Sequence, residues 1–402
     1  MAAITRPRKR SRQRKHASLP LDILLEIAVR SDPATLVRCA ATCKELRLHI
    51  AGTDLHGRSA SASPTVDSQS KDLSLVDNAN TTTRLLSAAA CFPPGAAAAA
   101  ANDNGDEVKL WRPVAARDGL VILEGISYRW PLVKLCVYCP ATGYVQALPP
   151  GLGLGGRHVL LVGDGGPAGC RRPFQVINLT LSRVGSNSRV QKFSSEQGTW
   201  ATSERIAFPL TNGDEMLSNN SVLVGDVVHW LCHQRLGMVD YYVVRLHVSA
   251  DDDDGDYRIS VTKLPKSFHR ACSSFNGATS RMVLATAEAG RRPIVLVASG
   301  GVISVWAQSS ELTGEWRKQP DLIVDCEAMH GICTLTSVRF LWFAERSGLV
   351  LLAAPDSSTF LLDLQSKKIT KYCSSSSRII SKTSVPYEMD PSSWVPTFSK
   401  IF

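Results

Sequence analysis

Long hydrophobic runs are missing from this 402-residue sequence, and no apolar segment follows its basic N-terminus. A membrane-spanning helix needs about 18 consecutive apolar residues, and a secretory signal needs an apolar core behind its basic start. We therefore expect neither a membrane span nor a secreted protein. The eleven cysteines are an odd number scattered along the chain, which favours buried, reduced thiols over a disulfide framework.

Motifs of hydrolases and of metal sites are also missing. The sequence contains no G-x-S-x-G or H-E-x-x-H motif, and no second C-x-x-C pair joins Cys136 and Cys139 to complete a zinc site. Those two cysteines lie in a predicted strand, where their odd spacing sends the thiols to opposite faces. His229, Cys232 and His233 are also in strand context, so a ligand role is the minor alternative there. We expect no catalytic residue, no metal and no cofactor.

Two segments match ligand-binding loops only in part. Gly151, Gly153 and Gly156 have the spacing of a dinucleotide fingerprint, but a predicted strand, Val159–Val162, follows them where the fingerprint needs a helix N-terminus. The acidic run 251–254 lacks carboxylates at the first and last positions of a calcium loop when the glycine after it takes position six. We interpret both segments as loops between strands.

Positive charge is concentrated at the N-terminus. The net charge of +9 falls to +2 once the seven basic residues between positions 6 and 15 are left out, so the remainder does not favour nucleic acid as a partner. The basic segment is typical of a nuclear-import signal, with non-specific nucleic-acid contact and a plain solvated tail as the alternatives. We therefore expect the protein in the nucleus and the cytoplasm. The residues assigned to this signal are Arg8, Lys9, Arg10, Arg12, Arg14 and Lys15.

Composition divides the chain into four segments. Residues 1–17 form a charged tail, and residues 18–51 contain two short predicted helices. Residues 52–109 are rich in Ser, Thr, Asn and Ala, which predicts a low-complexity linker. Residues 110–402 contain short apolar runs, such as Val222–Val228, that are too short for helices and rich in β-branched residues. The predicted fold class is mainly β: a short helical segment followed by a large all-β repeat domain.

A turn motif recurs through the β segment. In each copy a turn precedes an aromatic or apolar residue, and a proline follows a few residues later in most copies. The intervals between these positions are 56, 57, 59 and 53 residues, which is typical of propeller blades with three or four strands each. The segment has room for five blades, or for six if its two ends combine; a β-sandwich or barrel with chance spacing is the alternative. The repeated positions are Tyr144, Trp200, Tyr257, Trp316 and Ile369.

The helical segment carries clear start signals. Pro20 presets the backbone for a helix, and Asp22 complements the positive end of the helix dipole. Asp32 and Pro33 begin a second helix as N-cap and first-turn proline. Two helices this short cannot stabilise themselves in water. We therefore expect an interaction module whose apolar face is covered by another chain or by the β domain.

The segment from Leu19 to Ile50 resembles the F-box family in both halves of its motif, at the expected separation. Leu46 stands where a tryptophan often closes that motif, so the contact stays apolar but loses ring area. The order of the whole chain is also similar to a plant F-box family with a β-propeller-like associated domain. The positions that match the adaptor-binding residues of the family are Leu19, Pro20, Leu24, Ile27, Leu36, Cys43 and Lys44.

The resemblance implies a non-catalytic role in an SCF ubiquitin ligase. The F-box helices would bind a Skp-type adaptor, which bridges to a cullin and a RING subunit, while the β domain would hold a protein substrate that the sequence does not name. Each buried aliphatic side chain would contribute roughly 1.5–3 kcal/mol before the costs of association. Trp230, Trp306 and Trp342 are candidates for contacting the substrate, although such tryptophans more often belong to the blade core.

Two other functions stay open at this point. An enzyme built on the β domain would bring several His or carboxylate side chains to a central funnel. A nuclear interaction protein with a relic F-box would act through the basic tail and would bind nucleic acid in a salt-sensitive way.

Overall fold

A computed structural model describes three strands between residues 65 and 87 by their backbone, and most of the chain between 110 and 388. None of the helices that it describes is long and apolar enough to cross a membrane. The described residues are 23, 65–69, 72–76, 82–87, 110–126, 134–140, 143–151, 157–163, 172–180, 189–202, 214–216, 221–234, 240–248, 258–272, 279–288, 290–299, 302–309, 314–320, 322–325, 338–355, 358–373 and 384–388.

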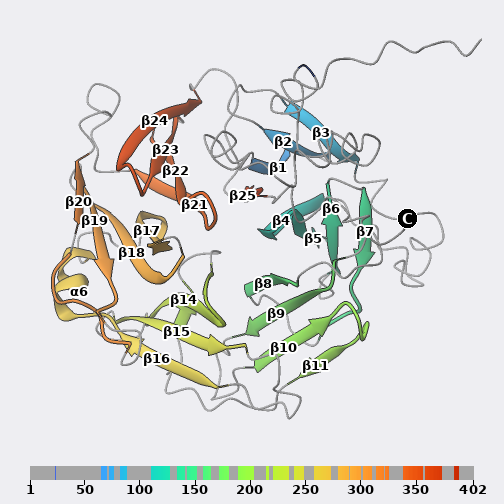
Figure 1. The fold of residues 1–402 in the computed structure, drawn as a ribbon, viewed down its shortest axis with the longest axis horizontal. Coiled ribbons are helices and arrows are strands. Elements are labelled where there is room, and N and C mark those ends of the chain that lie inside the picture. The colour runs from blue at the N-terminus through green and yellow to red at the C-terminus, as the bar shows by residue number, and fades with distance from the viewer. Residues whose placement is uncertain are drawn as a thin grey trace, which may run out of the picture.

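Six antiparallel sheets follow one another around a ring (Figure 1). Five of them contain strands that are consecutive in the chain, and the sixth combines β1, β2 and β3 with β25 from the other end of the chain. This arrangement is a β-propeller, so the predicted fold class of mainly β with five or six blades is confirmed.

The strand bounds are as follows, sheet by sheet. The sheet that joins the two ends contains β1 (Thr65–Gln69), β2 (Asp72–Val76), β3 (Thr82–Ser87) and β25 (Val385–Pro386). The next two sheets contain β4 (Leu110–Arg117), β5 (Leu120–Ile126), β6 (Lys134–Cys139) and β7 (Tyr144–Ala147), then β8 (Arg157–Val162), β9 (Phe174–Thr180), β10 (Arg189–Ser194) and β11 (Trp200–Thr202).

The remaining three sheets complete the ring. The first of them contains β12 (Asp214–Met216), β13 (Val222–Val224), β14 (Val227–Gln234), β15 (Tyr241–His247) and β16 (Ile259–Lys263). A short helix, α6 (Lys266–Cys272), and a 3-10 turn, η3 (Thr279–Arg281), precede β17 (Met282–Ala287), β18 (Arg292–Ser299), β19 (Val302–Ala307) and β20 (Leu322–Asp325). The last sheet contains β21 (Arg339–Ala344), β22 (Leu349–Ala353), β23 (Thr359–Asp363) and β24 (Lys368–Cys373).

Hydrophobic packing between neighbouring sheets holds the ring together. Ile122 of β5 shares an apolar cluster with Phe193 of β10, and Ile177 of β9 shares the next cluster with Trp230 of β14. A strand packed on both faces must be apolar at nearly every position, which is why the sequence shows continuous apolar runs rather than alternation. The core therefore lies between the blades, and it leaves the innermost strands to line the centre.

The repeated turn of the sequence joins the third strand of a blade to the fourth. Tyr144 and Trp200 begin β7 and β11, Ile369 lies in β24, and Trp316 forms an isolated bridge with Gln308. Just before these positions the backbone adopts a positive φ, between 58° and 73°, which glycine accepts without steric cost. The residues with this conformation are Gly143, Gly198, Gly314 and, in the one described copy without glycine, Lys367.

Two expectations about boundaries are wrong. The run Val222–Val228 is not one strand, because Gly225 takes a φ of 59° and turns the chain between β13 and β14. The range 52–109 is not a linker throughout, because β1, β2 and β3 lie within it. Their pairing explains the difference: β1 is hydrogen-bonded to β2 on one side and to β25 on the other, so a polar segment is ordered by a partner more than 300 positions away.

Candidate binding site at the centre of the propeller

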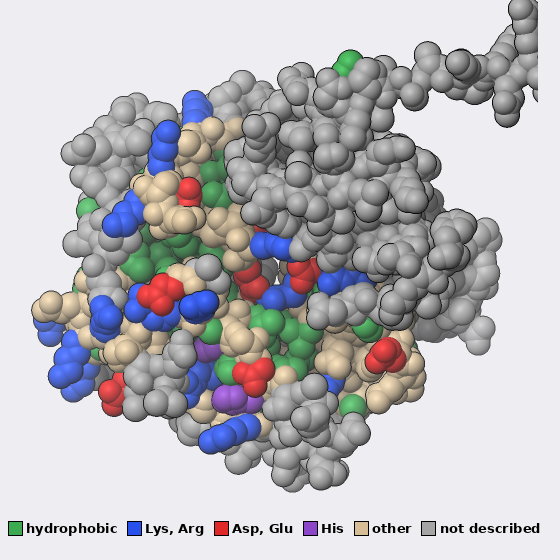
Figure 2. All heavy atoms as spheres, viewed as in Figure 1, with side chains coloured by type: hydrophobic (Ala, Val, Ile, Leu, Met, Phe, Trp, Pro, Cys, Tyr) green, Lys and Arg blue, Asp and Glu red, His purple; other side chains and the backbone are tan. Residues whose placement is uncertain are grey.

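A cavity of about 260 Å³ lies where the innermost strands of all six blades meet. The strands that line it are β4, β8, β13, β17, β21 and β25, and several of them contact one another directly. Figure 2 shows this face hollowed at its centre, with acidic and basic side chains next to apolar surface. Because every blade contributes to it, the cavity is the natural candidate for a binding site.

The residues that line the cavity change from apolar to charged along the strands. Val114 and Phe343 are apolar wall residues, and Arg117 and Glu345 follow them at the ends of β4 and β21. The turns after these two strands lie at the same end of the cavity, since Glu388 contacts both of them. The cavity therefore has a charged rim at one end and mainly apolar walls, to which Ser221 and Thr286 add two hydroxyls.

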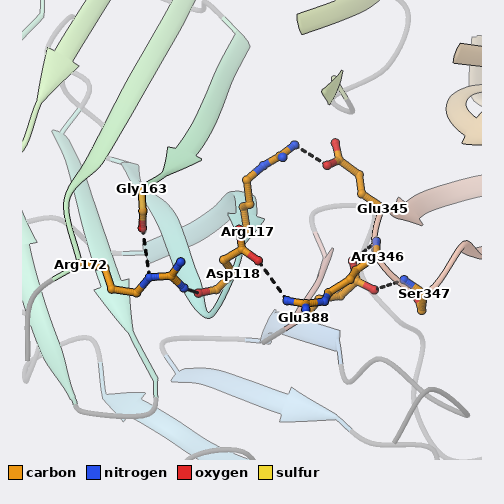
Figure 3. Close-up of polar contacts among 8 residues, drawn as sticks. All are labelled: Arg117, Asp118, Gly163, Arg172, Glu345, Arg346, Ser347 and Glu388. Carbon is orange, nitrogen blue, oxygen red and sulfur yellow. Dashed lines mark hydrogen bonds and ion pairs between the residues drawn. The ribbon is translucent and has the colours of Figure 1, made fainter. Parts of the chain in front are cut away.

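Arg117 and Glu345 form an ion pair across this rim, and they point toward one another in Figure 3. The second carboxylate oxygen of Glu345 accepts a hydrogen bond of 3.2 Å from the backbone N–H of Leu223. Burial raises the pKa of Glu345, and it outweighs the opposing effects of the Arg117 guanidinium and the Leu223 N–H. The site thus holds a carboxylate whose charge its surroundings compensate only in part.

Glu388 joins the last described segment to two blades. Its two carboxylate oxygens accept the backbone N–H groups of Arg346 and Ser347, at 2.9 and 2.8 Å. Its backbone carbonyl accepts the N–H of Gly119 at 2.8 Å, and the Tyr387 hydroxyl donates to the Gly119 carbonyl at 3.4 Å. These four contacts connect the turn after β21 with the turn after β4.

Asp118 completes the rim from the turn between β4 and β5. Asp118 and Gly119 both have positive φ, 46° and 82°, as a two-residue hairpin turn of type I′ requires. One Asp118 carboxylate oxygen lies 3.4 Å from the guanidinium of Arg346. Arg172 donates to the backbone carbonyls of Asp118 and Gly163, at 3.5 and 3.2 Å, so the turn is fixed from two sides (Figure 3).

The chemistry that this arrangement offers is binding. Its guanidinium and carboxylate groups already pair with one another, and they present both hydrogen-bond donors and acceptors around a mainly apolar hollow. The lining that the structure describes contains no histidine or cysteine. Within the described ranges, no group of three or more His, Cys, Asp or Glu side chains is placed to hold a metal ion.

The predicted adaptor-binding positions, from Leu19 to Lys44, and the predicted nuclear-import tail lie outside the described residues. So do Gly153, Gly156 and the acidic run 251–254. Within the F-box-like segment the structure describes Ile23, whose side chain is 44% exposed. The adaptor-binding residues therefore stay a prediction.

The three tryptophans considered as substrate contacts are core residues. Trp230, Trp306 and Trp342 are 1%, 3% and 0% exposed, so the interpretation as blade core is confirmed and the hypothesis that they contact a substrate is wrong. The physical reason is the packing of each blade on both faces, which gives large rings more buried area between blades than at the rim.

The cysteines and histidines behave as packing residues. Cys136 and Cys139 are buried, and only Cys139 belongs to the cluster on its side of β6, in line with the predicted opposite faces. His229 and His233 are buried in β14. Burial lowers the pKa of His229 to about 4, so this imidazole is neutral near pH 7.

Sequence reasoning missed Arg117, Glu345 and Glu388. The ion pair joins residues 228 positions apart, and no local pattern connects them. The one usable signal was the Asp118-Gly119 dipeptide between two apolar runs, which predicts a hairpin turn but says nothing about its neighbours.

Two family models match the chain. A model described as "Domain of unknown function (DUF7595)" matches residues 77–398, and a model described as "F-box-like" matches residues 16–58. The first match covers most of the chain and includes strand β3, which the sequence had assigned to a linker. No curated protein matches the chain.

The solved structures that the chain resembles are remote in sequence. A chain of a nidogen/laminin complex has a TM-score of 0.39 at 9% identity, and the match covers 77% of this chain and 92% of that chain. A hydrazine synthase of Kuenenia stuttgartiensis has a TM-score of 0.38 at 10% identity, covering 75% and 77%. A Lactobacillus plantarum protein has a TM-score of 0.39 at 11% identity, covering 77% and 81%. At these scores the likeness carries no argument about function.

Proposed function

This chain belongs to the DUF7595 family, and we propose that it is the substrate-recognition subunit of an SCF-type ubiquitin ligase. The observation that carries the proposal is the F-box-like match at residues 16–58, ahead of a propeller domain. The F-box would bind a Skp-type adaptor and, through it, the cullin and the RING subunit. The propeller would hold a target protein.

The two parts of the chain suit this division of work. The predicted F-box helices are too short to be stable alone and need a partner to cover their apolar faces. The propeller is rigid, because its blades pack on one another around a closed ring. A rigid domain with a central cavity can hold a target in a fixed orientation relative to the ligase.

In this proposal the protein works by proximity and makes or breaks no bond itself. Binding to the ligase and to the target at once raises the effective concentration of a target lysine near the ubiquitin thioester. The carboxylates around the cavity are the observation that favours a second candidate, an enzyme. Each of them, however, accepts hydrogen bonds from the surrounding turns or pairs with an arginine, which supports a structural and binding role.

The test is co-purification of the full chain with a Skp-type adaptor. We expect the parent to retain the adaptor and a Leu19→Ala, Pro20→Ala double variant to lose it. A variant with Arg8, Lys9 and Arg10 changed to alanine is the control, because the basic tail is outside the F-box motif and its loss leaves adaptor binding unchanged.

A folded parent chain that retains no adaptor would contradict the proposal. In that case a Leu46→Trp variant decides between two explanations. Recovery of binding would show that the F-box is otherwise intact and that the missing ring area prevents adaptor binding in the parent. Continued failure would favour a nuclear interaction protein with a relic F-box, and the basic tail would become the part to study.

A further inference from the structure

The size of the central cavity limits what it can hold. Sites for drug-sized ligands and cofactors usually enclose about 300–1,000 Å³. At about 260 Å³ the cavity lies just below that range, which is adequate for one large side chain. A single residue of a partner protein therefore fits better than a nucleotide or an extended cofactor.

The order of residues along the walls fixes the polarity of the occupant. Val114, Ala115 and Ala116 precede Arg117 on β4, and Phe343 precedes Glu345 on β21. A group that enters past the charged rim meets walls that are mainly apolar, with the hydroxyls of Ser221 and Thr286 but no charge among them. An ionised head group would lose its hydration there without gaining an opposite charge, so the inserted group must be uncharged and largely apolar.

The rim selects the flanking groups. Arg117 is paired with Glu345, and Arg346 lies beside Asp118, so an incoming ion would have to compete with an existing pair on either side. A peptide group is uncharged and offers one donor and one acceptor. It can accept from a guanidinium and donate to a carboxylate without separating either pair.

We propose that the cavity receives one large apolar side chain, of the size of phenylalanine, from a loop of the target protein, with the flanking peptide groups on the charged rim. The inference rests on the proposed function, since it specifies how the propeller holds its target. Large rings that fill a central pocket are the residues that contribute most to protein interfaces.

The test uses N-acetyl-phenylalaninamide, which is one such residue with a peptide group on each side. Saturation-transfer NMR on the full chain is expected to give saturable binding with a Kd of about 1 mM, as suits a ligand of this size. N-acetyl-glycinamide and the amide of N-acetyl-aspartate are expected to bind at least tenfold more weakly. No saturable binding of the phenylalanine probe, or equal binding of all three, would overturn the proposal.

A matched pair of variants locates the binding. Ala116 lines the cavity and Ala201 is exposed on the outer strand β11, so Ala116→Phe fills the hollow while Ala201→Phe adds the same side chain elsewhere. We expect the first variant to lose binding of the probe and the second to keep it. A folded Ala116→Phe variant that binds the probe as tightly as the parent would contradict the proposal.

Photo-crosslinking covers the case in which Ala116→Phe does not fold. N-acetyl-4-benzoylphenylalaninamide, irradiated with the parent chain, is expected to label residues of β4, β8, β13 or β21. Labelling confined to outer strands would place the apolar site elsewhere and reject the cavity. Adaptor binding by a chain that ignores the probe would refute this inference alone, whereas probe binding without adaptor binding would refute the ligase proposal alone.

Discussion

Gly314 is a position where the backbone conformation and a neighbouring side chain both disfavour a larger residue. Its φ is 70°, and a Cβ added there would lie 2.7 Å from a guanidinium nitrogen of Arg245. Gly198 has the same conformation, with a φ of 71°, but nothing lies within 4 Å of an added Cβ. The two glycines therefore separate the cost of backbone strain from the cost of displacing a neighbour.

We predict that Gly198→Ala lowers the free energy of unfolding by about 1 kcal/mol, the cost of a left-handed non-glycine residue. Gly314→Ala is expected to cost about 1 kcal/mol more, because Arg245 must move and its 3.0 Å hydrogen bond to Ser260 is lost. Urea denaturation measures both. In an Arg245→Ala background the two glycine variants should become equal, and a persistent difference would contradict the explanation.

His229 gives a prediction about pH. It is 4% exposed, its Nδ1 atom lies 3.1 Å from the Val227 carbonyl, and burial lowers its pKa from 6.5 to about 4. Between pH 4 and 6.5 this histidine is protonated in the unfolded chain and neutral in the folded chain. The free energy of unfolding therefore rises with pH over this range and falls on acidification. The loss from this group is roughly 3 kcal/mol by pH 4.

A His229→Gln variant should therefore show a flatter dependence of unfolding free energy on pH between 6.5 and 4. Guanidinium denaturation at pH 7.5 and pH 5 measures the slope for parent and variant. A variant as sensitive to acid as the parent would mean that other groups account for the effect.

Residues of the candidate site were the least predictable part of the molecule. The sequence identified tryptophans as large rings that anchor interfaces, but a ring's place in a core or at a rim depends on which blade packs beside it. Arg117 and Glu345 are ordinary charged residues at strand ends, and what makes them a pair is the closure of the ring. Neither the burial of the tryptophans nor this pairing can be predicted from the residues next to them in the sequence.

The turn between the third and fourth strands is the element that the sequence predicted best. Its glycine and the aromatic residue after it recur because each blade repeats the same local geometry. The copy at Lys367 departs from the pattern: its φ is 58° although the residue is not glycine. There the Asp363 carboxylate accepts hydrogen bonds from Gln365 and Ser366, and these contacts support the turn.

We predict that Lys367→Gly raises the free energy of unfolding by about 0.5 kcal/mol, since relief of left-handed strain exceeds the entropy that glycine adds to the unfolded chain. Lys368→Gly is the matched control. It changes an exposed residue of the adjacent strand β24, where glycine should lower the free energy by about 0.5–1 kcal/mol. Equal effects of the two variants in urea denaturation would contradict the assignment of strain to Lys367.

Other elements were mispredicted because their pairing is not local. The run Val222–Val228 contains a tight turn at Gly225 that the sequence did not indicate, because apolar residues stand before and after it. The strands β1, β2 and β3 lie in a polar stretch without the apolar density of the other blades, and composition therefore indicated a linker. Their order comes from hydrogen bonds to each other and to β25.

At the scale of the whole molecule, closure of the ring depends on four residues, Val385–Glu388. Val385 and Pro386 pair with β1, Tyr387 and Glu388 contact the turn after β4, and the Glu388 carboxylate holds the turn after β21. The sequence allowed a sixth blade if the two ends of the β segment combined, but it did not predict which residues would pair at that junction. A short segment with contacts to three blades is the point at which the ring is most sensitive to change.

A pair of truncated chains tests this dependence. A chain that ends at Glu388 keeps every described contact of the closing segment, and we expect it to unfold like the parent. A chain that ends at Ser384 loses β25 and the contacts to Gly119, Arg346 and Ser347, which leaves the innermost edge of the first sheet unpaired. Because propeller blades support one another only through their neighbours, the loss of stability should spread from the open junction.

Denaturation followed by amide hydrogen exchange is expected to show reduced protection first in β1, β4 and β21. Protection unchanged in these three strands would mean that the ring is held closed by the packing between blades alone.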